Sequence, residues 1–207
     1  AIKASVPYDR VIDDANRMPG ARWFDGARLN FAENLLRYRD DRLALVFRGE
    51  DQVRRTFTYA QLYDEVARVA MALKDAGVVA GDRVAGFVPN MPESIIAMLA
   101  ASSLGAAWSS CSPDFGIKGV LDRFGQIRPK VLFTADGYFF KGKPLDSLAR
   151  IADIISQIPS VERLVVVPYA REKPDISAIP NAVLYADFKS AEDGLEIDRK
   201  STRLKEC

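Results

Sequence analysis

A short segment, Cys-Ser-Pro-Asp-Phe-Gly at 111–116, carries side chains suited to binding a small anion. Ser112, Pro113 and Asp114 stand just before a pattern typical of a helix, and the free amides at a helix N-terminus favour carboxylate or phosphate groups. The same residues also have a structural interpretation, because Asp114 can cap the helix and Pro113 can shape the turn. Both roles are compatible, and we treat the segment as a candidate loop at the edge of a substrate site.

A second candidate loop, 135–143, places Lys141 and Lys143 on either side of a glycine, next to three aromatic residues. Ammonium groups can hold a phosphate, and an aromatic ring can cover a flat base. Lysines in a polar loop are also commonly only solvated. The residues alone leave both interpretations open.

Other chemistry is excluded by composition. The chain has no histidine and two cysteines, Cys111 and the last residue, Cys207, which removes imidazole catalysis and predicts no metal site. Cys111 has no adjacent His or Lys to lower its pKa, so we expect a buried, unreactive thiol. No GxxxxGK[ST] phosphate loop occurs, and Gly77, Gly81 and Gly86 are spaced for a helix end, a turn and strand packing.

An alternation of strand and helix patterns positions the candidate loops. Short β-branched or apolar runs predict strands at 83–88, 106–110, 131–134, 163–167 and 182–185. Helical spacing predicts three helices. One starts near Asn90 and Pro92, one is capped by Asp114 and ended by Pro129, and one spans about 145–157. The alternation predicts an α/β fold with a mostly parallel sheet and flanking helices. Ligands then bind beyond the carboxyl ends of the strands, at 89–92, 111–116 and 135–143.

The N-terminal part is less regular. Residues 1–42 predict an irregular segment with a short helix at 34–38, whose apolar side chains must wrap the body of the protein. A hairpin is expected from strands at 43–47 and 55–57. Thr58 and Gln61 form a capping-box pattern, which starts a helix that Gly77 ends.

Charge and cysteine content restrict location and partners. With 29 Lys and Arg against 28 Asp and Glu, the net charge is +1 and the charges are interspersed without a sustained basic stripe, so we expect no nucleic-acid partner. The apolar runs are shorter than the roughly 20 residues that span a bilayer, so we expect no membrane association. A chain without a disulfide framework or signal-peptide pattern favours the cytoplasm. Because the first residue is not Met, we expect that the N-terminus is clipped.

Five segments resemble one enzyme family: WFDGARLNFAENLL at 23–36, TYAQL at 58–62, GDRVA at 81–85, PNMPE at 89–93 and WSSCSPDFG at 108–116. The family is the acyl-CoA synthetases, adenylate-forming ligases that activate carboxylates. The middle three segments are shared across the family, whereas the first and last are similar to members that act on acetoacetate. The resemblance covers about residues 6–190.

This resemblance implies an enzyme that uses ATP, Mg²⁺ and coenzyme A to join acetoacetate, or a related short carboxylate, to the thiol through an acyl-adenylate. In the family, a Ser/Thr/Gly-rich loop with a lysine holds the ATP phosphates, a later aspartate holds the ribose, and a lysine on a C-terminal domain assists adenylation. None of these motifs occurs in this sequence. We therefore expect no catalytic residue here, and an incomplete first subdomain that is inactive alone.

The resemblance also bears on the second candidate loop. It is similar in position to a loop that carries arginines for the coenzyme A phosphates in related enzymes. Lys143 matches a basic position, and Lys141 does so after a shift of register. Lysine is a point charge where arginine binds phosphate through two parallel bonds.

The resemblance divides the chain into an irregular segment at 1–42, an α/β subdomain of the AMP-binding domain at 43–190 and a tail at 191–207. The tail does not resemble the family, and we expect a truncated protein with a foreign or misread end. Two other functions remain open: a non-catalytic α/β module that binds coenzyme A or a nucleotide, and a scaffold that binds no ligand.

Overall fold

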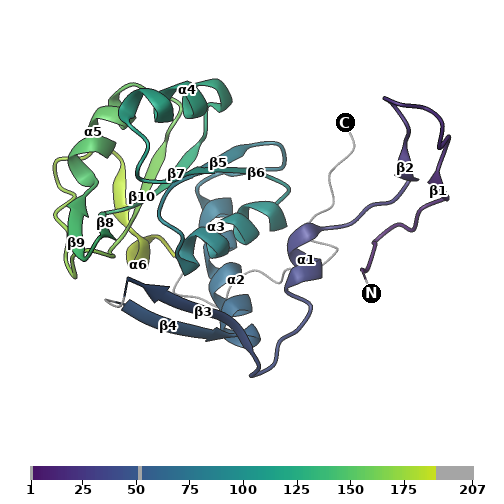
Figure 1. Cartoon of the computed structure of the whole chain (residues 1–207), viewed down its shortest axis with the longest axis horizontal. Helices are drawn as coiled ribbons and strands as arrows, with labels where there is room; N and C mark the ends of the chain where they lie inside the picture. Colours follow the sequence, from purple (N-terminus) through teal and green to yellow (C-terminus); the bar gives the residue numbers. More distant parts are fainter. Residues whose placement is uncertain (1, 51–52, 190–207) are drawn as a thin grey trace.

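A five-stranded parallel sheet forms the centre of the computed structural model, which describes residues 2–50 and 53–189 (Figure 1). Its strands are β5 (Arg83–Phe87), β6 (Ala107–Cys111), β7 (Val131–Ala135), β10 (Arg163–Val167) and β11 (Ala182–Leu184). Their spatial order is β11-β10-β7-β5-β6, and every neighbouring pair is parallel. The predicted α/β fold with a mostly parallel sheet and flanking helices is confirmed.

Helices cover both faces of this sheet (Figure 1). Helices α2 (Tyr59–Asp75) and α3 (Pro92–Ser103) pack on one face together with the short α6 (Tyr185–Phe188). Helices α4 (Ile117–Ile127) and α5 (Leu148–Ser156) pack on the other. Alternate residues of each strand point to opposite faces, so Val84 and Phe133 join the first cluster of buried side chains and Ala85 and Leu132 the second.

Local sequence signals explain where the best-predicted helix begins and ends. The Thr58 hydroxyl accepts the Gln61 amide and the Gln61 side chain accepts the Thr58 amide, which is the predicted capping box. Gly77 has a φ of +75° just after α2, a conformation that glycine adopts without steric cost. The apolar face that the spacing predicted is buried, and it consists of Leu62, Val66, Val69, Ala70 and Leu73.

An antiparallel hairpin, β3 (Leu43–Gly49) and β4 (Val53–Thr58), lies over α2 and was correctly predicted. A second hairpin, β8 (Gly137–Phe140) and β9 (Lys143–Asp146), follows β7 directly. The sequence predicts a loop at 135–143 and a helix over about 145–157. The loop prediction is wrong, because the chain pairs with itself across Lys141 and Gly142. The helix prediction is confirmed, although α5 begins at Leu148.

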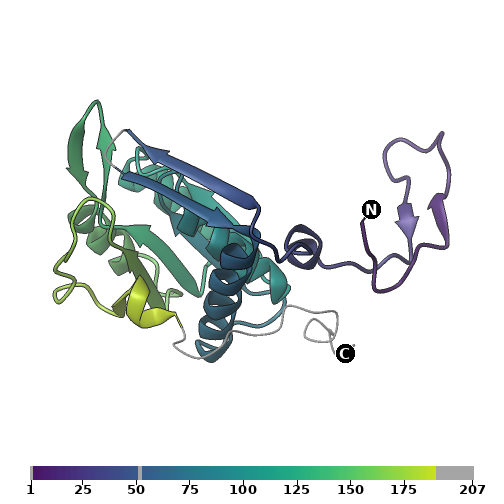
Figure 2. The same ribbon diagram turned by 90° about the horizontal axis from the view of Figure 1, so that it is seen from below.

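The N-terminal part extends away from the sheet (Figures 1 and 2). Helix α1 (Phe31–Leu35) begins earlier than predicted. The side chain of its N-cap, Asn30, donates a hydrogen bond to the Ser103 carbonyl at the end of α3. Before it, β1 (Arg10–Ile12) and β2 (Trp23–Asp25) form a two-stranded ribbon that the sequence did not indicate. Trp23 stays 62% exposed there, so its apolar surface is not covered by the described residues.

Two helices have N-caps other than those predicted. The N-cap of α3 is Met91, not Asn90, although Pro92 occupies the first turn as predicted. The N-cap of α4 is Gly116, with no side-chain cap. The prediction that Asp114 caps this helix is wrong, because its carboxylate instead accepts the hydroxyl of Ser112.

The predicted tail at 191–207 lies outside the described residues, and the division of the chain at 42 and 190 stays a prediction. Among the described residues, no helix combines the length and apolar character that crossing a bilayer requires.

Candidate functional site

The three candidate loops lie side by side at the carboxyl edge of the sheet. They follow β6, β5 and β7, which are neighbours in that order. The connection after β5 runs through α3 on one face, whereas the connection after β7 leads to α5 on the other. The strand order therefore reverses between β5 and β7, the position where open parallel sheets usually bind ligands.

Segment 112–116 forms a tight turn held largely by its own residues. The Ser112 hydroxyl donates to the Asp114 carboxylate at 3.0 Å, and both residues are exposed. Pro113 is buried, and its carbonyl accepts the Arg150 guanidinium from α5 at 2.9 Å. Ser112 and Asp114 are thus available to a ligand, whereas Pro113 is part of the wall.

Residues 140–143, here called the lysine turn, connect β8 to β9. Phe140 pairs with Lys143, and the two residues between them, Lys141 and Gly142, have φ values of +53° and +74°. Positive φ at both central positions is what a two-residue hairpin turn of type I′ requires. Lysine adopts this conformation at a cost, so the hairpin imposes it.

The charges of the lysine turn are exposed. Lys141 and Lys143 are both exposed, and neither ammonium forms an ion pair with another described residue. The Nζ atom of Lys141 lies 5.3 Å from the centre of the Phe140 ring, which is itself 51% exposed. Of the three aromatic residues in the loop, Phe140 is the one that could stack on a base, because Tyr138 is buried and Phe139 packs against Tyr169.

The two hairpins meet beside this turn. The Gly142 amide donates to Oε2 of Glu50 at 3.0 Å, which joins the end of β3 to the lysine turn. Tyr169, in the loop after β10, has its ring centre 6.0 Å from that of Phe47 and 5.4 Å from that of Phe139. Burial raises the pKa of Tyr169. The hairpins are therefore fixed to each other through an aromatic contact and a hydrogen bond.

A buried carboxylate fixes the loop that supplies Tyr169. Asp136 follows β7 and is fully buried. Its carboxylate accepts the backbone amides of Tyr169, Ala170 and Arg171 at 2.6 to 2.9 Å. Three hydrogen bonds from backbone amides satisfy the buried carboxylate, so Asp136 has a positioning role.

A partly buried ion pair attaches the β3–β4 hairpin to the helix layer. Both oxygens of Glu93, in the first turn of α3, accept the guanidinium of Arg55 from β4. Burial alone would lower the pKa of Arg55, but the hydrogen bonds and charge of Glu93 hold it above its usual value. Burial raises the pKa of Tyr185 well above its usual range, and Glu65 and Glu93 raise it further.

The thiol of Cys111 is buried at the end of β6, and this burial raises its pKa. The nearby charge of Arg123 acts in the opposite direction but is the smaller effect. Its environment favours the neutral thiol, not the nucleophilic thiolate.

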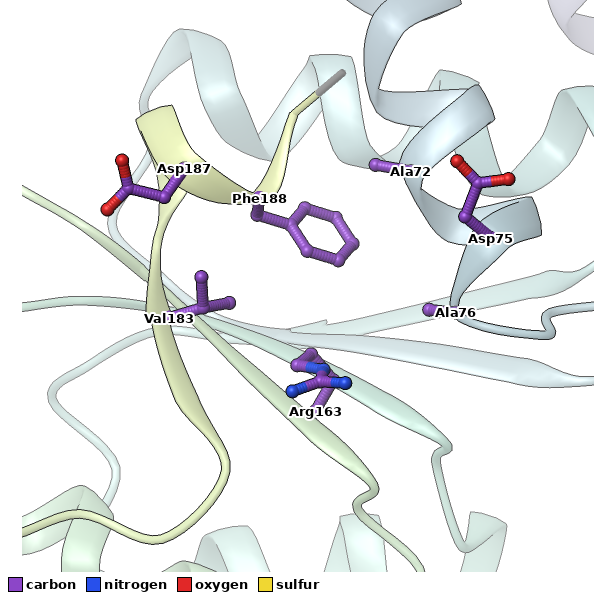
Figure 3. A pocket seen from close by; sticks show the side chains of 7 residues that line it. All are labelled: Ala72, Asp75, Ala76, Arg163, Val183, Asp187 and Phe188. Atoms are coloured by element: carbon purple, nitrogen blue, oxygen red, sulfur yellow. The ribbon is translucent and has the colours of Figure 1, made fainter. Parts of the chain in front are cut away.

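A hollow among the described residues lies elsewhere. It has a volume of about 320 Å³ and is lined by the end of α2, the start of β10, Val183 and α6 (Figure 3). The ring of Phe188 projects from α6 toward the end of α2, and the carboxylate of Asp187 points away from the Phe188 ring (Figure 3). Because Arg163 is the first residue of β10, the hollow is at the amino edge of the sheet, away from the loops where parallel sheets bind ligands.

The contacts of Glu50 and Asp136 with residues far along the chain were not predicted from the sequence. Glu50 and Asp136 contact residues 92 and at least 33 positions away, and no local motif signals such contacts. The described residues contain no group of three or more His, Cys, Asp or Glu side chains that could hold a metal ion.

Residues 31–194 match the model of the family described as AMP-binding enzyme, and the chain belongs to this family. The relatives it is similar to are acetoacetyl-CoA synthetases. That of Rhizobium meliloti is 47% identical over 87% of this chain and 28% of the relative, and that of Macaca fascicularis is 44% identical over 89% and 28%. The solved structure of acetoacetyl-CoA synthetase from Streptomyces lividans aligns with a TM-score of 0.84 at 39% identity, over 94% of this chain and 30% of that one. The chain thus spans less than a third of the length of these relatives.

Proposed function

We propose that this chain is the N-terminal part of an ATP-dependent acyl-CoA ligase that activates acetoacetate to acetoacetyl-CoA through an acyl-adenylate. Membership of the AMP-binding enzyme family supports the reaction class. The names of the similar curated proteins support acetoacetate as the carboxylate. The proposed partners are therefore small molecules, not nucleic acid, and the proposed location is the cytoplasm.

The described residues do not fit two groups that the proposed reaction uses, Mg²⁺ and the phosphates of ATP. The described residues offer no acidic cluster for Mg²⁺, and the sequence has no Gly-rich lysine loop for the ATP phosphates. We derive no step through either group, and we assign no catalytic residue to this chain. Alone, it is expected to release no pyrophosphate from ATP and acetoacetate.

The lysine turn does fit a phosphate group of coenzyme A. Lys141 and Lys143 present two ammonium groups without ion pairs among the described residues, next to the exposed ring of Phe140. Such a site would hold a phosphate by charge and a base by stacking. We infer that Lys143 is the principal phosphate contact and that Lys141 supports it.

Segment 112–116 is the second part of this proposal. Ser112 and Asp114 are exposed beside the carboxyl end of β6, and buried Pro113 holds the turn against α5. We propose that this segment forms one wall of the substrate cleft. Its residues would shape the cleft, and they would not take part in proton transfer.

The observation that carries the proposal is the pair of exposed lysines, neither ion-paired with a described residue, on a hairpin turn at the carboxyl edge. Calorimetric titration of the chain with coenzyme A tests it. Saturable binding is expected, weakened about five-fold or more by Lys143→Ala and less by Lys141→Ala, since each charged contact contributes about 1 kcal/mol. Lys74→Ala, an exposed lysine in the last turn of α2, is the matched control. Equal affinity in all four proteins would refute the site.

A further inference from the structure

Glu50 stands at the place where an incoming phosphate would reach the lysine turn. Its Oε2 atom accepts the Gly142 amide at 3.0 Å. In a two-residue hairpin turn the ladder bonds run between the flanking residues, here Phe140 and Lys143. The Gly142 amide is therefore free to bind an acceptor outside the hairpin, and Glu50 supplies one.

The contact is not an ion pair. Glu50 binds the amide between Lys141 and Lys143, yet neither ammonium is ion-paired with a described residue. The carboxylate thus takes the backbone donor and leaves both side-chain cations open. A phosphate that approaches these cations meets a negative charge already at the centre of the turn.

The surrounding structure allows Glu50 to leave without rearranging the hairpins. Tyr169 packs against Phe47 of one hairpin and Phe139 of the other, and its hydroxyl lies close to Gly49. The Asp136 carboxylate holds the Tyr169 backbone independently. Displacement of Glu50 therefore requires a change of side-chain rotamer only.

We propose that Glu50 is an internal competitor that sets the affinity and selectivity of the lysine turn. Its carboxylate occupies the Gly142 amide in the free protein, and a phosphate monoester displaces it on binding. A phosphate monoester carries a charge of about −1.5 to −2 and three acceptor oxygens, so it competes better than a singly charged anion. The inference rests on the proposed function of the turn and names the phosphate monoester as its ligand chemistry.

Titration of Glu50→Gln with adenosine 3′,5′-bisphosphate, by calorimetry at low ionic strength, tests the proposal. Glutamine keeps the size of the side chain and removes its charge, so the variant is expected to bind at least about five-fold tighter than the parent chain. The gain should shrink as salt is added, because exposed charges are screened. Glu162→Gln, a charge change at the amino edge on a side chain 65% exposed, should leave affinity unchanged.

Selectivity is measured in the same way with adenosine 5′-monophosphate, adenosine 3′,5′-bisphosphate and acetate. Glu50→Gln should strengthen binding of the two phosphate monoesters by a larger factor than binding of acetate, because loss of a fixed negative charge relieves more repulsion for the more highly charged anion. Unchanged or weaker binding of the bisphosphate by Glu50→Gln would overturn the proposal, as would absence of binding by both proteins.

The Lys143→Ala variant separates this inference from the proposed function. If Lys143→Ala weakens binding but Glu50→Gln does not strengthen it, the turn is a phosphate site and Glu50 is no competitor. If Lys143→Ala has no effect in either background, the turn is not the site and both proposals fail. Circular dichroism of each variant checks that the fold is kept.

Discussion

Replacing Glu93 by Met should destabilise the chain, because it leaves the guanidinium of Arg55 half-buried without a partner. Glu93 is 7% exposed and Arg55 34% exposed, and the pair is bidentate. The Nε atom of Arg55 has no hydrogen-bond partner among the described residues, so the guanidinium depends mainly on its two bonds to Glu93.

The magnitude follows from burial. Removing one partner of a fully buried pair costs about 3–5 kcal/mol. Water still reaches a third of Arg55, which reduces the expected loss to about 2 kcal/mol. With a urea dependence of about 2 kcal/mol per molar for a domain of this size, the unfolding midpoint should fall by roughly 1 M.

The double variant Arg55→Met/Glu93→Met is the control. It leaves no unpaired charge, so it should be more stable than Glu93→Met alone, with a coupling energy of about 2 kcal/mol between the two sites. A loss below about 0.5 kcal/mol for Glu93→Met, or two losses that simply add, would refute the reasoning. Either result would mean that the pair does not fasten the β3–β4 hairpin to α3.

Three further predictions concern single sites. Thr58→Ala should lower the free energy of unfolding by about 1 kcal/mol through loss of the capping box, and Thr58→Ser should restore most of it in urea titrations. In a Cys207→Ser background, Cys111 should react with a thiol reagent at pH 8 far more slowly than in urea, because burial raises its pKa; equal rates would contradict its buried environment. Burial tends to raise the pKa of Asp146, but the hydrogen bond from Arg171 and the nearby backbone bonds lower it overall. The stabilisation by Asp146 is therefore present above the unfolded pKa of about 3.9, and it is lost as pH falls through the lower folded pKa. The difference in urea midpoint between the parent chain and Asp146→Asn should therefore shrink below about pH 4. A difference that stays constant with pH would contradict this.

Local signals made much of the fold predictable. The capping box at Thr58 and the apolar face of α2 are set by residues within a few positions of each other, so they can be read directly. The apolar runs at 131–134 and 163–167 are bounded by turn residues and form buried strands as expected. The strand order, in which β5 lies between β6 and β7, could not be predicted, because it depends on packing between distant segments.

The errors fall where distant contacts override local pattern. The position of segment 135–143 after a strand predicts a loop, yet the segment pairs with itself as a hairpin, and its Phe139 packs against Tyr169. Asp114 had the right spacing for a cap, but its neighbour Ser112 offered a closer partner. The likeness to acyl-CoA synthetases identified the family correctly, although it contained no information on Glu50.

We propose that the lysine turn is where this chain binds a phosphate of coenzyme A. Amide chemical shifts of the isotopically labelled chain, recorded during titration with coenzyme A, test it most directly. We expect the changes to concentrate at Gly142 and Lys143 and to include Glu50, because its hydrogen bond is released. Changes confined to the hollow around Arg163 and Val183, or spread without focus, would contradict it.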